Sequence, residues 1–125
     1  MKEAFVGLII QLRLGPEFGP DNGMADREGL IDTMRRFLGE WPSTDSGSRS
    51  TNIKCWDIPP ARWDEALHIA LGAVQARGLS ERAVIARVDY LAAEEGEDYE
   101  WGPERIVWPA EKAGLFSMWP EWPGF

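Results

Sequence analysis

A run of alternating apolar residues near the N-terminus constrains the fold of this chain most strongly. Every even position from 4 to 14 is apolar, whereas the odd positions include Gln11 and Arg13. Successive side chains of a strand point to opposite faces of a sheet, so the pattern predicts a long strand. One face of this strand is expected to be buried, and the other to become solvent-exposed towards its end. The run is too short to cross a membrane as a helix, which needs about 20 apolar residues.

Two later segments carry apolar residues at helical spacing. The first follows a predicted loop at residues 15–23; Asp26 is its candidate cap, and its apolar stripe continues to Trp41. The second begins at Pro60, because a missing N–H costs nothing in a first turn, and it ends before Gly78. Each stripe covers one side only, so both helices are predicted to pack against a sheet.

Three further strands are predicted at residues 51–58, 83–91 and 105–108. Residues 42–50, with the sequence PSTDSGSRS, are small and polar and predict a loop. The order strand, helix, strand, helix, strand, strand favours an α+β fold, a two-layer sandwich of about four strands with both helices on one face. A ferredoxin-like variant is the closest named architecture by element order.

Length and composition predict one domain. The chain has 125 residues, of which 44% are hydrophobic, and this is typical of a single folded unit. We expect an α+β body at residues 1–108, followed by an irregular arm rich in Trp and Pro at residues 109–125. Trp119 and Trp122 in this arm each precede a proline, which keeps the chain extended and stops a helix.

The negative charge is concentrated near the C-terminus. The chain has 21 acidic and 13 basic residues and a net charge of −8. Residues 91–125 hold eight of the acids and two of the bases, and therefore three quarters of the net charge. An acidic chain is repelled by nucleic-acid phosphates and by anionic lipids, so we expect neither direct nucleic-acid binding nor membrane binding.

Aromatic residues share this acidic part of the chain. Trp and Tyr are enriched at binding hot spots, and carboxylates around them steer a basic partner towards the surface. The plain alternative is a solvated turn between two strands, because runs of charge are commonly exposed. We expect a basic protein partner to bind the acidic run and its rings, which comprise Glu94, Glu95, Glu97, Asp98, Tyr99, Glu100 and Trp101.

No sequence motif points to catalysis, to a phosphate or to a metal. Cys55 is the only cysteine and His68 the only histidine, so neither an internal disulfide nor a thiolate zinc site is expected. The acidic run lacks the ligand spacing of a calcium loop, and the glycines form neither a P-loop nor a dinucleotide-binding motif. We expect no metal and no cofactor.

Two functional hypotheses from different classes follow. The favoured one is an inhibitor, in the manner of an immunity protein, that occludes the basic active site of a toxin or effector. A cytoplasmic location is expected, because the N-terminus lacks the charge and cleavage site of a signal peptide. The alternative is a small ligand-binding or enzymatic domain, able to pair with a second copy as a homodimer. Its pocket would be lined by Cys55, Trp56, Trp63 and His68, with Cys55 or His68 as the reactive group.

Overall fold

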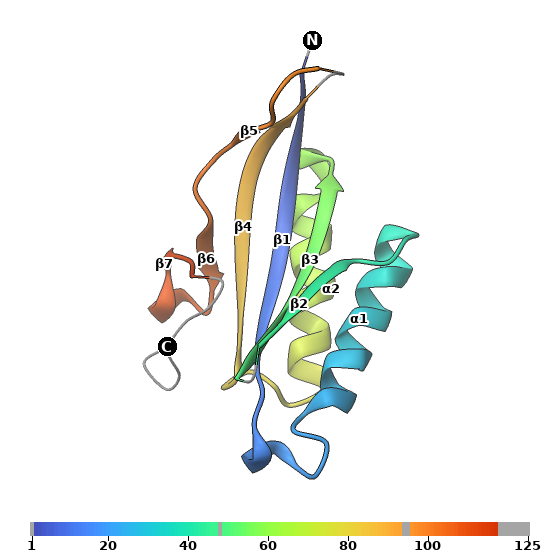
Figure 1. Ribbon diagram of the computed structural model, residues 1–125, viewed down its shortest axis with the longest axis vertical. Helices are drawn as coiled ribbons and strands as arrows, with labels where there is room; N and C mark the ends of the chain where they lie inside the picture. The colour runs from blue at the N-terminus through green and yellow to red at the C-terminus, as the bar shows by residue number, and fades with distance from the viewer. Residues whose placement is uncertain (1, 48, 94–95, 118–125) are drawn as a thin grey trace.

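Two helices cover one face of an antiparallel sheet in this protein (Figure 1). The computed structural model describes residues 2–47, 49–93 and 96–117. The described strands are β1 (Glu3–Arg13), β2 (Ser43–Ser46), β3 (Ser50–Ile58), β4 (Ala83–Ala92), β5 (Glu100–Trp101), β6 (Arg105–Trp108) and β7 (Gly114–Leu115), and the helices are α1 (Met24–Leu38) and α2 (Trp63–Ala76).

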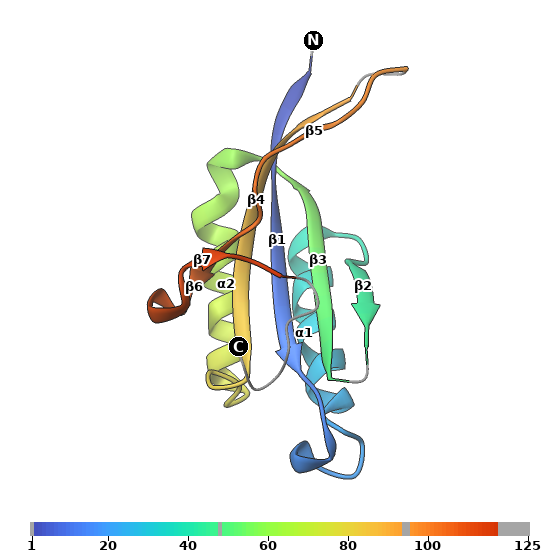
Figure 2. The same cartoon turned by 60° about the vertical axis from the view of Figure 1, so that its left-hand side comes forward.

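The long strand β1 lies inside the sheet. The strand order is β2-β3-β1-β4-β6-β7, with β5 also paired to β4, and every described pair is antiparallel. Helix α1 connects β1 to β2, and α2 connects β3 to β4; both helices lie on the same side of the sheet (Figures 1 and 2). The predicted α+β class is therefore confirmed. The predicted count of about four strands is wrong, because the described part of the sheet has seven.

One of the additional strands, β2, lies where the sequence predicts a loop. Its backbone pairs with β3, from Ser43 opposite Lys54 to Ser46 opposite Thr51. Most of its side chains are exposed, and Asp45 forms an ion pair with Lys54. An edge strand needs one backbone ladder and no buried face, so it forms here without apolar alternation.

The predicted arm also begins with regular structure. Residues Ala110–Lys112 form a 3-10 turn, and β7 follows and pairs with β6. This part of the arm is not irregular, because the backbone of β6 pairs with β7. The sequence of the arm itself does not reveal this pairing. Trp119 and Trp122 lie outside the described residues.

Helix α1 begins earlier than the candidate cap Asp26 predicts. The side chain of Asp21 accepts hydrogen bonds from the backbone N–H of Gly23 (3.0 Å) and of Ala25 (2.8 Å). These bonds, that from Ala25 foremost, lower the pKa of the Asp21 carboxyl. Asp26 instead pairs with Arg82 (3.0 Å), which joins the first turn of α1 to the loop before β4.

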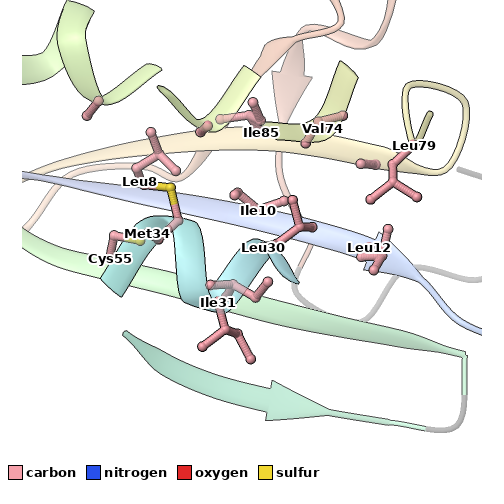
Figure 3. Packing of buried hydrophobic residues seen from close by; sticks show 14 of the residues in the cluster. Leu8, Ile10, Leu12, Leu30, Ile31, Met34, Cys55, Val74, Leu79 and Ile85 are labelled. Carbon is pink, nitrogen blue, oxygen red and sulfur yellow. The ribbon is translucent and has the colours of Figure 1, made fainter. Parts of the chain in front are cut away.

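The main core lies between the helices and the sheet (Figure 3). The even positions of β1 from Val6 onwards face it, and Leu8, Ile10 and Leu12 have no exposed surface, whereas Ala4 is exposed. Their neighbours across the sheet include Ile53 on β3 and Ile85 on β4, which both lie opposite Ile10. The prediction of a buried face is therefore confirmed for the even positions from Val6 onwards. The helices add Leu30, Ile31, Met34, Ala66, Ala70 and Val74 to this core.

The second face of β1 is buried as well. Ile9 and Gln11 have no exposed surface. The Gln11 side-chain amide donates hydrogen bonds to Asn52 Oδ1 (2.9 Å) and to the Ser117 carbonyl (3.0 Å). The segment that follows β7 crosses this face (Figure 2). The prediction that this face is solvent-exposed is therefore wrong at Gln11, because a segment more than 100 positions away in the sequence lies over this side chain.

Candidate functional site

Aromatic side chains gather at one end of the sheet, on the face away from the helices. Trp56 on β3 and Tyr90 on β4 have the parity opposite to the core residues Cys55 and Ile85 of the same strands. Strand β5 then places Trp101 opposite Tyr90. Phe5 on β1 also lies opposite Tyr90, with ring centroids 6.0 Å apart. We call the group formed by Trp56, Tyr90, Tyr99 and Trp101 the aromatic corner.

Two glycines make room for this arrangement. A Cβ atom at Gly7 would lie 2.6 Å from the Trp56 ring and 2.8 Å from Val88 Cγ1, so the indole packs directly on the β1 backbone. Next to Trp101, the Gly102 N–H donates a hydrogen bond to the Asp89 carbonyl (2.8 Å). A Cβ atom at Gly102 would lie 2.7 Å from that oxygen. Both contacts require a residue without a side chain.

The rings of the aromatic corner form an offset stack with one indole beside it. The rings of Tyr90, Tyr99 and Trp101 have centroids 4.6 to 6.1 Å apart and interplanar angles of 16° to 31°, so their faces partly overlap. The Trp56 indole stands at 83° to Tyr90 and 68° to Trp101, edge-on to this stack. These four residues and Asp57 line an open cavity of about 260 Å³.

Asp57 is held in place at this cavity by Tyr90. The Asp57 backbone N–H donates to the Tyr90 hydroxyl (2.6 Å), and this hydroxyl donates to Asp57 Oδ1 (2.5 Å). Asp57 has a φ of 59°, a left-handed conformation that Asp and Asn adopt more readily than most residues. Burial raises the pKa of the Tyr90 phenol, and the bond to Asp57 raises it further, so the phenol keeps its proton. The carboxylate therefore has a fixed orientation.

Carboxylates of the acidic run flank Tyr99 and precede Trp101 in the sequence. Glu97, Asp98 and Glu100, which we call the acidic rim, are exposed. Lys2 Nζ lies 3.6 Å from a carboxylate oxygen of both Glu97 and Glu100. Among the rings, Trp101 is 56% exposed and Tyr99 46% exposed. Five of the predicted partner-binding residues are thus exposed along one segment, and the remaining two, Glu94 and Glu95, lie outside the described residues.

The residues of the alternative pocket are not brought together. Cys55 is fully buried on the helix-facing side of β3, and burial raises the pKa of its thiol to about 12. Trp56 projects from the other side of the sheet, into the aromatic corner. Trp63 is buried on α2, where the Arg87 guanidinium lies 4.6 Å from its ring centroid, and His68 is exposed. This pocket therefore has neither an accessible thiol nor a sheltered imidazole.

Phe5, Asp57 and Tyr90 were not predicted as site residues from the sequence. Tyr90 and Trp56 alternate with the core residues of their strands. This alternation predicts that both lie on the outer face of the sheet once the strands have been assigned. Their meeting depends on the pairing of β1 with both β3 and β4, a long-range contact that local patterning does not specify.

Comparison of the chain with protein-family models, with curated proteins and with solved structures gave no match. Across residues 2–47, 49–93 and 96–117, no three His, Cys, Asp or Glu side chains are grouped so that they could hold a metal ion. No helix in this part of the chain is long and apolar enough to span a membrane.

Proposed function

We propose that this protein is a small inhibitor of immunity type, which binds a toxin or effector and occludes its basic active site. Its docking surface comprises the aromatic corner and the acidic rim. The observation that carries this proposal is the exposure of the stacked rings of Tyr99 and Trp101 in the same segment as the exposed carboxylates. Large exposed rings cost free energy in water, and they are the side chains that most often dominate binding energies in interfaces.

The charges around these rings favour a basic partner. The acidic rim holds Glu97, Asp98 and Glu100, and Asp57 lies at the neighbouring cavity. Lys2 is shared between Glu97 and Glu100 at 3.6 Å, so one cation offsets two carboxylates. A surface of this sign attracts Lys and Arg side chains and accelerates their approach.

The alternative, a ligand-binding or enzymatic domain, has less support. The cavity of the aromatic corner, at about 260 Å³, is smaller than the 300–1,000 Å³ that is typical of small-molecule pockets. Its lining includes neither Cys55 nor His68, the two groups on which the alternative depended for its chemistry. A cavity of this size is suited to a single side chain of a larger partner.

We also propose that strands β2, β3, β1 and β4, with both helices, are a ferredoxin-like variant. The connection β1-α1-β2-β3-α2-β4 and the strand order β2-β3-β1-β4 support this comparison. On this view β5, β6 and β7 are additions to the common core. The docking surface depends on one of these additions, because β5 supplies Trp101 and Glu100.

Affinity capture from the native host at low and at high salt tests the proposed function. We expect recovery of one basic protein in an equimolar ratio at low salt. Its retention should fall at high salt, because exposed charge pairs are screened beyond a Debye length of about 10 Å at 0.1 M salt. Failure to recover an equimolar partner would contradict the proposal. Recovery of an acidic partner whose retention does not change with salt concentration would contradict it as well.

A further inference from the structure

We propose that the cavity of the aromatic corner is the receptor for one arginine side chain of the partner. The guanidinium group stacks on the exposed ring surface of Tyr99 and Trp101 and bonds to the carboxylate of Asp57. This inference rests on the proposed function, which supplies the basic partner, and adds to it the residue type that anchors the complex.

The shape of the cavity suits a planar cation. Three of its rings form an offset stack with planes within 31° of one another, and the Trp56 indole stands at a steep angle beside them. A guanidinium stacks on aromatic faces and is more weakly hydrated than an ammonium group, so it enters such a site at a lower cost than lysine does. Both Trp101 and Tyr99 are exposed and present ring surface to a partner.

Asp57 supplies the negative charge at this cavity. The Tyr90 hydroxyl engages Oδ1, and in the part of the chain that the structure describes no group donates a hydrogen bond to Oδ2. None of the described cations forms an ion pair with Asp57 either. Arg62, which lines an adjoining cavity together with Asp57, is paired with Glu65 (2.5 Å) and lies over the Phe37 ring at 4.6 Å. Asp57 is therefore an oriented carboxylate available to an incoming cation.

The geometry favours arginine over other cationic groups. A carboxylate of fixed orientation can accept two parallel N–H donors from a guanidinium, whereas an ammonium group binds as a point charge. Because the Tyr90 phenol keeps its proton, it continues to orient Asp57 when a cation binds. The ring stack and the carboxylate thus impose two conditions, planarity and positive charge. At neutral pH an arginine side chain meets both, whereas the lysine ammonium group is not planar and an unperturbed histidine is mostly neutral.

Titration of the full chain with N-acetyl-arginine amide, followed by NMR of the indole N–H signals, tests this inference. We expect the signals of Trp56 and Trp101 to shift, and the signal of Trp63 on the other side of the sheet to stay unchanged. N-acetyl-lysine amide should bind more weakly, and the neutral isostere N-acetyl-citrulline amide about tenfold or more weakly than arginine, because it lacks the charge.

The variant Asp57→Asn removes the charge and keeps the geometry. Asn tolerates the left-handed conformation, and its amide oxygen still accepts the Tyr90 hydroxyl. We expect this variant to lose arginine affinity by about tenfold with an unchanged thermal midpoint. The matched control, Asp64→Asn, removes one exposed charge from α2 and should bind arginine as the wild type does.

Two results would overturn the inference even if the capture experiment succeeds. One is equal binding of arginine and citrulline, and the other is an Asp57→Asn variant with undiminished arginine affinity. An arginine response confined to Trp56 and Trp101, and lost in Asp57→Asn, would support it. If that response were found while capture yielded no partner, the proposed inhibitor function alone would fail.

Discussion

Reversing two charges of the acidic rim, by Glu97→Lys and Glu100→Lys, is expected to abolish the capture of a basic partner. The two carboxylates share Lys2 in the free protein, so the change replaces two attractions with a cluster of three cations beside the exposed rings. Association with the recovered partner should slow by on the order of tenfold or more at low salt. Stopped-flow or biosensor measurement of the association rate checks this.

The control for this variant carries the same change in net charge elsewhere. Glu81→Lys and Glu111→Lys alter two exposed residues outside the docking surface, the first in the turn before β4 and the second in a 3-10 turn near β7. This control should bind with a nearly unchanged association rate. If both double variants lose binding equally, net charge governs the interaction, and a localised docking surface is refuted.

The second large effect concerns stability. Ile10 has no exposed surface, lies opposite Ile53 and Ile85 in the centre of the sheet, and points into the core beneath the helices (Figure 3). Ile10→Ala should lower the free energy of unfolding by about 2–5 kcal/mol, through lost burial and the cavity that remains. The total free energy of unfolding of a domain is about 5–15 kcal/mol, so the expected loss is a large fraction of it. Urea denaturation followed by tryptophan fluorescence measures it.

A surface variant provides the comparison for the core. Leu115→Ala truncates a side chain that is 80% exposed on β7, and it should change the free energy of unfolding by no more than about 0.5 kcal/mol. A cost for Ile10→Ala as small as that for Leu115→Ala would show that β1 does not lie in a packed core.

The principal helices and strands could be predicted because each carries a complete local signal. The even positions of β1 are apolar throughout and face the core from Val6 onwards, and the strand predicted at residues 105–108 matches β6. The helix predicted after Pro60 also forms, as α2. In each segment the periodicity of the side chains matches the element that buries them, so local pattern and tertiary packing agree.

The elements that were missed depend on partners that are distant in the sequence. Strand β2 has the sequence STDS and is held by backbone pairing to β3. The sequence pattern predicts a solvent-facing Gln11, yet its side-chain amide donates hydrogen bonds to Asn52 and to the Ser117 carbonyl. Polar residues of this kind are buried only when another segment supplies hydrogen bonds, and no local pattern reports that segment.

The candidate site was found in part for the same reason. Charge counting located Glu97, Glu100 and Trp101, since composition alone reveals an acidic and aromatic segment. It could not reveal that Trp56 and Tyr90, from two other strands, complete the cavity beside them. The negative charge near the C-terminus thus identifies the acidic residues of the docking surface. The pairing of β1 with β3 and β4 brings Trp56 and Tyr90 together.

Site-specific photo-crosslinking in the native host tests the central claim most directly. A photoreactive phenylalanine analogue is introduced in place of Tyr99 in one version of the protein and in place of the exposed His68 of α2 in a second version. We predict a covalent adduct with one basic protein from the position of Tyr99 and none from that of His68. The same adduct from both positions, or an adduct from the position of His68 alone, would contradict the proposed docking surface.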